Sequence, residues 1–167
     1  GVASNLFTLL QTFSYGIGNA AQPIIGENLG AGQRNRVEQT RHLGGMVAFL
    51  IGCVAALICL AIPAQVVSLH MKASPEILSM APSVLRKYFV CFLFIPFNVF
   101  TTYYLQAVKR VKASVLVSVL RGFLLSGSFV FIFPFLFGAS SIWFVMPCAE
   151  CITTLLALWL LHRKVDA

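Results

Sequence analysis

The sequence predicts an all-α integral membrane protein with about five transmembrane helices. Of its 167 residues, 59% are hydrophobic and 10% are charged, whereas soluble domains have about 25% charged residues. The apolar runs reach the length of about 20 residues that a helix needs to cross the hydrocarbon core. They show no strict alternation of polar and apolar residues, which argues against a membrane β-barrel.

Five segments have the length and composition of a membrane span. The first three contain no charged residue, the fourth contains Arg121 and the fifth contains Glu150. Each segment is too long for a strand, so we expect each to form a helix. The segments are residues 3–26, 43–64, 88–108, 113–135 and 141–161.

The basic residues between these spans predict how the chain is oriented. Eight Lys and Arg residues lie in residues 29–41, in residues 109–112 and in the C-terminal tail, against three on the opposite side. The positive-inside rule therefore places these loops and the C-terminus in the cytoplasm. Short basic clusters between apolar runs are typical of membrane topology, so we expect a lipid partner and no nucleic acid.

We expect the chain to be part of a longer protein. It begins at Gly1 without a methionine and without a recognisable signal peptide. An odd number of spans that starts outside the cell fits a chain cut in the middle.

The cysteines and the other reactive residues do not predict an enzyme. Five cysteines fall in apolar segments, where free thiols that pack as small apolar groups are the expectation. Cys148 and Cys151 form a C-x-x-C pair, but no further ligands accompany them, so we expect no metal. The sequence has no Ser/His/Asp set and no paired carboxylates, so we expect no catalytic residue and no cofactor.

Polar residues within the first span are candidates for a substrate or ion pathway. Pro23 lacks an N–H group and frees the carbonyl of Asn19, which lies near the amides of Asn19 and Gln22. Such a polar spot occurs where a helix faces protein or a water-filled cavity. A plain packing kink remains the alternative interpretation.

The third span repeats this combination of a proline and an amide. Pro96 and Asn98 lie at mid-membrane, and Tyr103 and Gln106 follow. Aromatic faces attract cations, so this span is a candidate wall of a cation site. The alternative is that its aromatic residues simply face lipid or the core.

Arg121 and Glu150 are the charged residues that lie well inside spans. A charge at the bilayer centre costs at least about 2.5–3.5 kcal/mol on insertion scales, and pairing offsets much of this cost. The two residues lie about 22 Å and about 15 Å from the turn between their helices, which is within reach of an arginine side chain. We expect a structural ion pair, and a proton-carrying role for Glu150 is the alternative.

Three stretches together resemble the multidrug and toxic compound extrusion (MATE) family of transporters. Gln106-Ala107 to Arg121 resembles the junction of the tenth and eleventh helices, and residues 133–150 resemble the last helix pair. Glu27 departs from the pattern, because the family commonly has an aromatic residue there. The residues that match the end of the eighth helix and its cytoplasmic loop are Gln22, Pro23, Gly26, Asn28, Gly30, Ala31 and Gly32.

The resemblance implies that the chain is most of the C-terminal lobe, helices eight to twelve of a twelve-helix, two-lobed transporter. It implies a multi-pass cell-membrane protein, expected in a bacterial inner membrane, whose N-terminal lobe is missing here. It also implies export of organic cations and similar small molecules, coupled to sodium or protons, by alternating access. Some sodium-coupled members use an acidic residue in the third span, and its absence moves the coupling site toward the missing half.

Two other functions are compatible with the sequence. A flippase for lipid-linked saccharides has a related two-lobed fold, but it needs a strongly cationic cavity for pyrophosphate. A non-transporting membrane subunit needs no intramembrane proline, amide or charge, and this chain has all of them.

Cysteine labelling of the full-length protein tests the predicted topology. Cysteines introduced at Gln33 and Val165 should react with an impermeant maleimide only after the cells are opened, because both positions are predicted to be cytoplasmic. The unsubstituted protein is the control for its native thiols. Labelling of either position in intact cells would show that the orientation is wrong.

Overall fold

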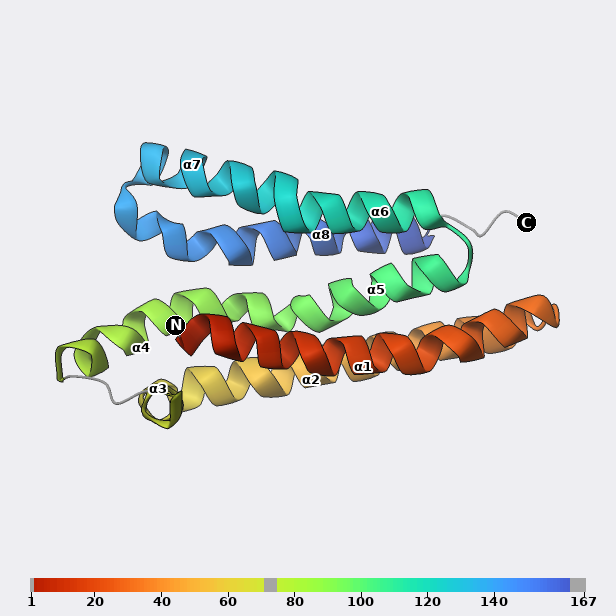
Figure 1. The fold of residues 1–167 in the computed structure, drawn as a ribbon, viewed down its shortest axis with the longest axis horizontal. Coiled ribbons are helices and arrows are strands. Elements are labelled where there is room, and N and C mark those ends of the chain that lie inside the picture. The colour runs from red at the N-terminus through yellow and green to blue at the C-terminus, as the bar shows by residue number, and fades with distance from the viewer. Residues whose placement is uncertain (1, 71–74, 163–167) are drawn as a thin grey trace.

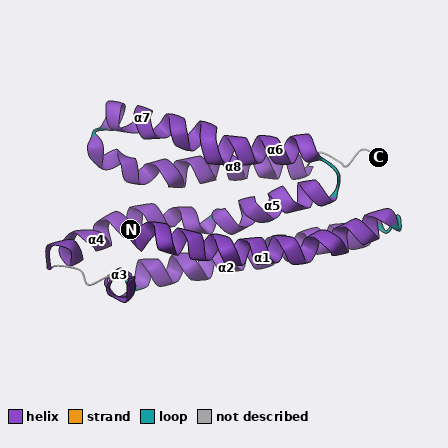
Figure 2. Cartoon of the chain, in the orientation of Figure 1, coloured by secondary structure: helices purple, strands orange, loops and turns teal. Residues whose placement is uncertain are grey.

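The computed structural model describes residues 2–70 and 75–162, and these residues form helices joined by short turns (Figure 2). The part of the chain that is described contains no strand. The α-helices are α1 (Val2–Gly30), α2 (Arg34–Ala61), α3 (Pro63–His70), α4 (Pro75–Phe89), α5 (Ile95–Ala107), α6 (Val111–Val119), α7 (Ser126–Phe137) and α8 (Val145–His162). Short helical segments of other types join them: η1 (Val90–Leu93), η2 (Leu120–Leu125) and η3 (Ala139–Phe144).

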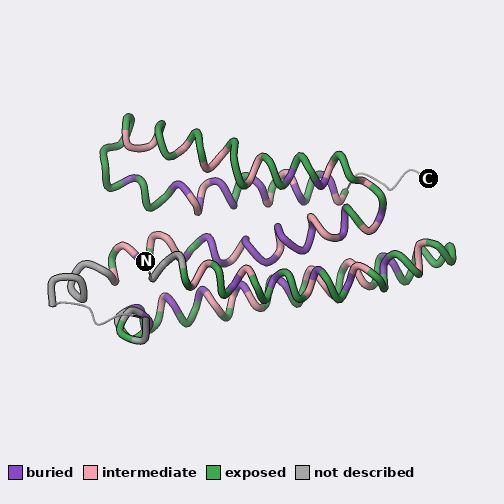
Figure 3. The backbone as a smooth tube through the Cα atoms, in the orientation of Figure 1, coloured by how far each residue is buried: buried purple, intermediate pink, exposed green. Residues whose placement is uncertain are grey.

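Helix α5 is the centre of the arrangement. It lies between the α1–α2 hairpin and the layer formed by α6, α7 and α8 (Figure 1), and it packs against α1, α2, α6 and α8. Most of its residues are buried, whereas the outward faces of α2 and α7 are exposed and apolar (Figure 3). Such faces suit contact with lipid or with further protein.

Four helical stretches within the described residues are long and apolar enough to cross a membrane. They are Arg34–Ala61, Pro82–Ala107, Val111–Phe137 and Ala139–His162, which contain most of the last four expected spans. Helix α1 has 29 residues but is not among the four, because polar residues recur along its length and lower its hydropathy. The expected connection at residues 65–82 is also helical where it is described, since α3 and α4 occupy it.

The basic turns gather at one end of the bundle. The α1–α2 turn and the α5–α6 turn lie at the same end in Figure 1, and the opposite end holds α3 and the α7–α8 connection. At the first end, Arg110 Nη1 donates to the carbonyl of Leu160 at 2.8 Å, so a turn cation satisfies a carbonyl near the C-terminus of α8.

The Gly-rich loop motif ends helix α1. Gly32 has φ +71°, a left-handed conformation that glycine adopts without steric cost. The amide of Gln33 donates to the carbonyl of Asn28 at 2.8 Å, and the amide of Gly32 donates to Leu29 at 3.1 Å. This is the bonding pattern of a Schellman cap, so Gly32 has a clear structural role in the turn.

A break in the membrane helix precedes α5. Residues of η1 form a 3-10 turn, and Pro96 follows in the first turn of α5 without an N–H group to donate. Gly52 of α2 packs directly against this break. A Cβ atom at Gly52 would lie 2.7 Å from the carbonyl oxygen of Phe92 and 3.0 Å from that of Leu93, so α2 and the break approach more closely than alanine allows.

We expect Gly52→Ala to destabilise the protein by about 1–3 kcal/mol, because backbone atoms must move to admit the methyl group. The matched control is Gly26→Ala in α1, where an added Cβ meets nothing within 4 Å and helix propensity favours alanine by about 0.5–1 kcal/mol. Thermal unfolding of the detergent-solubilised full-length protein measures both. Equal melting temperatures for the two variants would contradict the close packing at Gly52.

Candidate functional site

A buried carboxylate forms the centre of the candidate site. The Glu150 side chain in α8 is 1% exposed, and its Oε1 accepts from Arg121 Nε of η2 at 2.6 Å. Its Oε2 accepts from Asn98 Nδ2 of α5 at 2.8 Å. Each carboxylate oxygen therefore has a donor from a different helical segment, which is what a buried charge requires to be tolerated.

Asn98 and Thr154 complete this network. Asn98 is fully buried, and its Nδ2 also donates to the backbone carbonyl of Glu150 at 3.0 Å. Its Oδ1 accepts from the hydroxyl of Thr154 at 3.0 Å. Among the described residues, no buried side-chain nitrogen or oxygen lacks a hydrogen-bond partner. The network thus joins α5 to α8 without an unsatisfied polar atom.

The backbone around Arg121 is not a regular α-helix. Residues Leu120–Leu125 form a π-helical segment, and single π-helical turns are frequent at functional sites. The hydroxyl of Ser126 donates to the carbonyl of Arg121 at 2.7 Å. This hydroxyl satisfies the Arg121 carbonyl where the regular helical pattern is interrupted.

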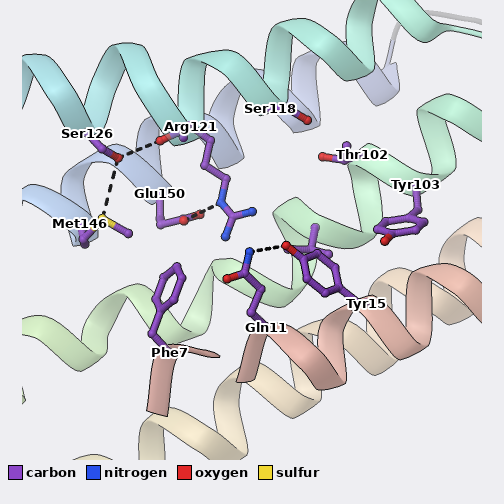
Figure 4. Close-up of a pocket in the computed structure, with 12 residues that line it drawn as sticks. Phe7, Gln11, Tyr15, Thr102, Tyr103, Ser118, Arg121, Ser126, Met146 and Glu150 are labelled. Carbon is purple, nitrogen blue, oxygen red and sulfur yellow. Dashed lines mark hydrogen bonds and ion pairs between the residues drawn. The ribbon is translucent and has the colours of Figure 1, made fainter. Parts of the chain in front are cut away.

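A cavity of about 460 Å³ opens beside the ion pair. Figure 4 shows Arg121 and Glu150 on one side of it and Phe7, Gln11 and Tyr15 of α1 on the other. Three aromatic side chains and several hydroxyl groups surround the charged centre. The lining residues are Phe7, Gln11, Tyr15, Val99, Thr102, Tyr103, Ser118, Arg121, Gly122, Ser126, Met146 and Glu150.

The candidate pathway residues named from the sequence fall into separate places. Glu150 and Tyr103 line the cavity, and Asn98 is bonded to Glu150. Asn19 and Pro23 are exposed and do not line it. Helix α1 continues through Pro23 to Gly30, so the proline removes one backbone donor without ending the helix.

Gln22 and Gln106 form a different connection, between α1 and α5. Gln22 Nε2 lies 3.2 Å from Gln106 Oε1, and Gln106 Nε2 donates to Ser114 Oγ at 3.1 Å. Ser114 in turn donates to the carbonyl of Thr102 at 3.1 Å. This relay links α1, α5 and α6 and lies outside the cavity lining, so its observed role is to join helices.

Sequence reasoning missed the part of the cavity that α1 provides. Gln11 Nε2 donates to the hydroxyl of Tyr15 at 2.5 Å, and the ring of Tyr15 lies 6.1 Å from that of Tyr103. Positions 7, 11, 15, 18 and 22 are spaced by three or four residues, which is the spacing of one helix face. That spacing was the available signal for a face of α1 that packs on α5.

A metal centre is not evident in the residues that the structure describes. They contain no group of three or more His, Cys, Asp or Glu side chains arranged to hold a metal ion. The described cysteines are free thiols.

The family comparison identifies the chain. The MatE family model matches residues 1–132, which is well over half of the sequence. The chain therefore belongs to the MatE family and is a multi-pass membrane protein. A search of curated proteins finds no significant match.

Two solved structures share the fold. One is described as the outward-facing conformation of a multidrug resistance MATE family transporter of the MOP superfamily, with a TM-score of 0.86, 19% identity and 97% of this chain covered. The other is described as the inward-facing conformation of such a transporter, with a TM-score of 0.84, 19% identity and 96% coverage. The chain spans 37% and 38% of the lengths of these two proteins.

We expect strong energetic coupling between Arg121 and Glu150. Arg121→Ala and Glu150→Ala should each destabilise the full-length protein by about 3–5 kcal/mol, because each leaves an unpaired charge at a mostly buried site. The double variant should lose less than the sum of the two changes. Thermal unfolding of all four proteins, each purified in the same detergent, measures the cycle.

Arg41→Ala provides a control, because Arg41 pairs with the half-exposed Glu38 and such pairs contribute about 0–1 kcal/mol. Strictly additive losses for the Arg121 and Glu150 changes would show that the ion pair does not stabilise the fold.

Proposed function

We propose that this chain forms most of one lobe of a secondary transporter that exports organic cations and similar small molecules. The observation that carries this proposal is the cavity between helices α1, α5, α6, α7 and α8, with aromatic walls and a charged pair in its lining. Charged residues within the apolar thickness of a membrane are costly, and such residues typically mark the pathway of a transported ligand or ion. Membership of the MatE family supports the same proposal.

The cavity suits a ligand with apolar and cationic parts. The rings of Phe7, Tyr15 and Tyr103 offer apolar area and electron-rich faces, and such faces attract cations. The second lobe, which this sequence lacks, would supply the opposite wall for alternating access. A transported small molecule, surrounding lipid and that lobe are therefore the proposed partners, and a transporter is proposed rather than an enzyme.

Export would be coupled to sodium or protons that move inward. Both oxygens of Glu150 already accept hydrogen bonds, which supports a structural ion pair more than an open ion site. Span Pro82–Ala107 contains no carboxylate. We therefore propose that the coupling ion binds mainly in the part of the protein outside this chain. We also propose that the protein resides in a bacterial inner membrane.

The flippase alternative has less support. A pyrophosphate group needs several basic residues, but the lining of this cavity contains a single basic residue, Arg121, which is paired with Glu150. A membrane subunit that does not transport would not need a cavity lined by a charged pair.

Transport by the full-length protein in liposomes tests the proposal. Ethidium, an aromatic organic cation, should move in the direction opposite to the proton or sodium flow that an imposed gradient drives, and faster than in protein-free liposomes. An ionophore that collapses the gradient should abolish this movement. The matched variant is Tyr103→Ala, which removes an aromatic wall and should slow ethidium movement. Movement no faster than in protein-free liposomes under both gradients would contradict the proposal.

A further inference from the structure

The guanidinium group of Arg121 has unused donors that open onto the cavity. Arginine has five N–H donors, and Arg121 uses Nε for its bond to Glu150. Its terminal nitrogens make no hydrogen bond within the described residues. Because no buried side-chain nitrogen there lacks a partner, these terminal nitrogens are not fully buried, and Arg121 lines the cavity. Figure 4 shows them pointing away from Glu150 toward α1.

The unused donors have the geometry that recognises a carboxylate. The two terminal nitrogens of an arginine form a planar fork that binds two carboxylate oxygens at once. A further donor lies on the α1 side of the cavity, because the hydroxyl of Tyr15 accepts from Gln11 Nε2 and keeps its own proton to donate. The donors of Arg121 and Tyr15 thus converge on one cavity.

Charge balance favours a ligand that carries both signs. Arg121 and Glu150 together have no net charge, so a simple anion held by Arg121 would leave a net negative charge in a low-dielectric site. A zwitterion keeps the site neutral. Its carboxylate matches the Arg121 fork, and its ammonium group matches the aromatic wall formed by Tyr15 and Tyr103, two rings that pack against each other with centroids 6.1 Å apart.

We propose that this cavity is a carboxylate-binding subsite for small aromatic zwitterions, with Arg121 holding Glu150 through Nε and the ligand carboxylate through its terminal nitrogens. The inference rests on the proposed transport function, which it makes more specific. A carboxylate binding here completes the hydrogen bonds of Arg121 without breaking its bond to Glu150.

Binding of a matched ligand pair to the full-length protein tests this subsite. The probes are 4-(aminomethyl)benzoic acid and 4-(aminomethyl)benzamide, which share the ring and the ammonium group but differ in the carboxylate. Isothermal titration calorimetry in lipid nanodiscs should show the acid binding roughly tenfold more tightly, since hydrogen bonds to charged groups exceed neutral ones by about this factor. Equal affinities, or no measurable binding of the acid, would overturn the proposal and indicate that Arg121 is satisfied within the protein.

Variants assign the preference to Arg121. Arg121→Lys keeps the positive charge beside Glu150 but removes the fork, so the preference for the acid should fall to roughly twofold. The matched control is Arg41→Lys, the same change in an ion pair that does not line the cavity, and it should keep the full preference. A preference that survives Arg121→Lys would overturn the proposal.

A second variant keeps the test decisive if Arg121→Lys fails to fold. Tyr15→Phe removes the hydroxyl donor from the wall of the cavity and should lower the preference for the acid by roughly threefold to tenfold. An unchanged preference in Tyr15→Phe would then count against the subsite. Binding is measured without an ion gradient, so the two proposals fail separately. Absence of ethidium transport would contradict the transport function, and equal affinities for the acid and the amide would contradict the subsite.

Discussion

The burial of one carboxylate constrains how the helices of this chain are held together. Glu150 is 1% exposed within a helical stretch that is long and apolar enough to cross a membrane, and an unpaired charge there is strongly unfavourable. Its donors come from α5 and from η2, so the same hydrogen bonds that neutralise Glu150 also fix the relative positions of three helical segments. The cavity lies beside this pair, and both Arg121 and Glu150 contribute to its lining.

Irregular backbone accompanies this polar centre on two helices. The 3-10 turn before Pro96 precedes Asn98 by a few residues, and the π-helical segment contains Arg121. Both segments depart from the regular α-helical pattern of backbone hydrogen bonds. Membrane helices tolerate such departures only where protein or water satisfies the freed backbone groups. Ser126 does so for the carbonyl of Arg121, and Gly52 allows α2 to pack against the carbonyls before Pro96.

Much of the architecture could be predicted from the sequence, since span length and charge distribution follow from the cost of placing polar groups in lipid. Residues 43–64, 113–135 and 141–161 lie largely within observed apolar helices. The depth of Arg121 and Glu150 followed from the helical rise per residue, and the structure places their side chains 2.6 Å apart. Asn19 and Pro23 illustrate the opposite case, because a polar residue in a span does not reveal which face of the helix it occupies.

The sequence by itself determined that this is an all-helical membrane protein, and its ordered motifs indicated the family. These properties depend on composition, run length and local spacing, which the chain carries without reference to its neighbours. Tertiary structure decided the azimuth of each helix, and therefore that Gln11 and Tyr15 face Arg121 across a cavity while Gln22 and Gln106 bond to each other outside it. Rotation of one helix about its axis changes none of the local signals in the sequence, yet it changes every contact between helices.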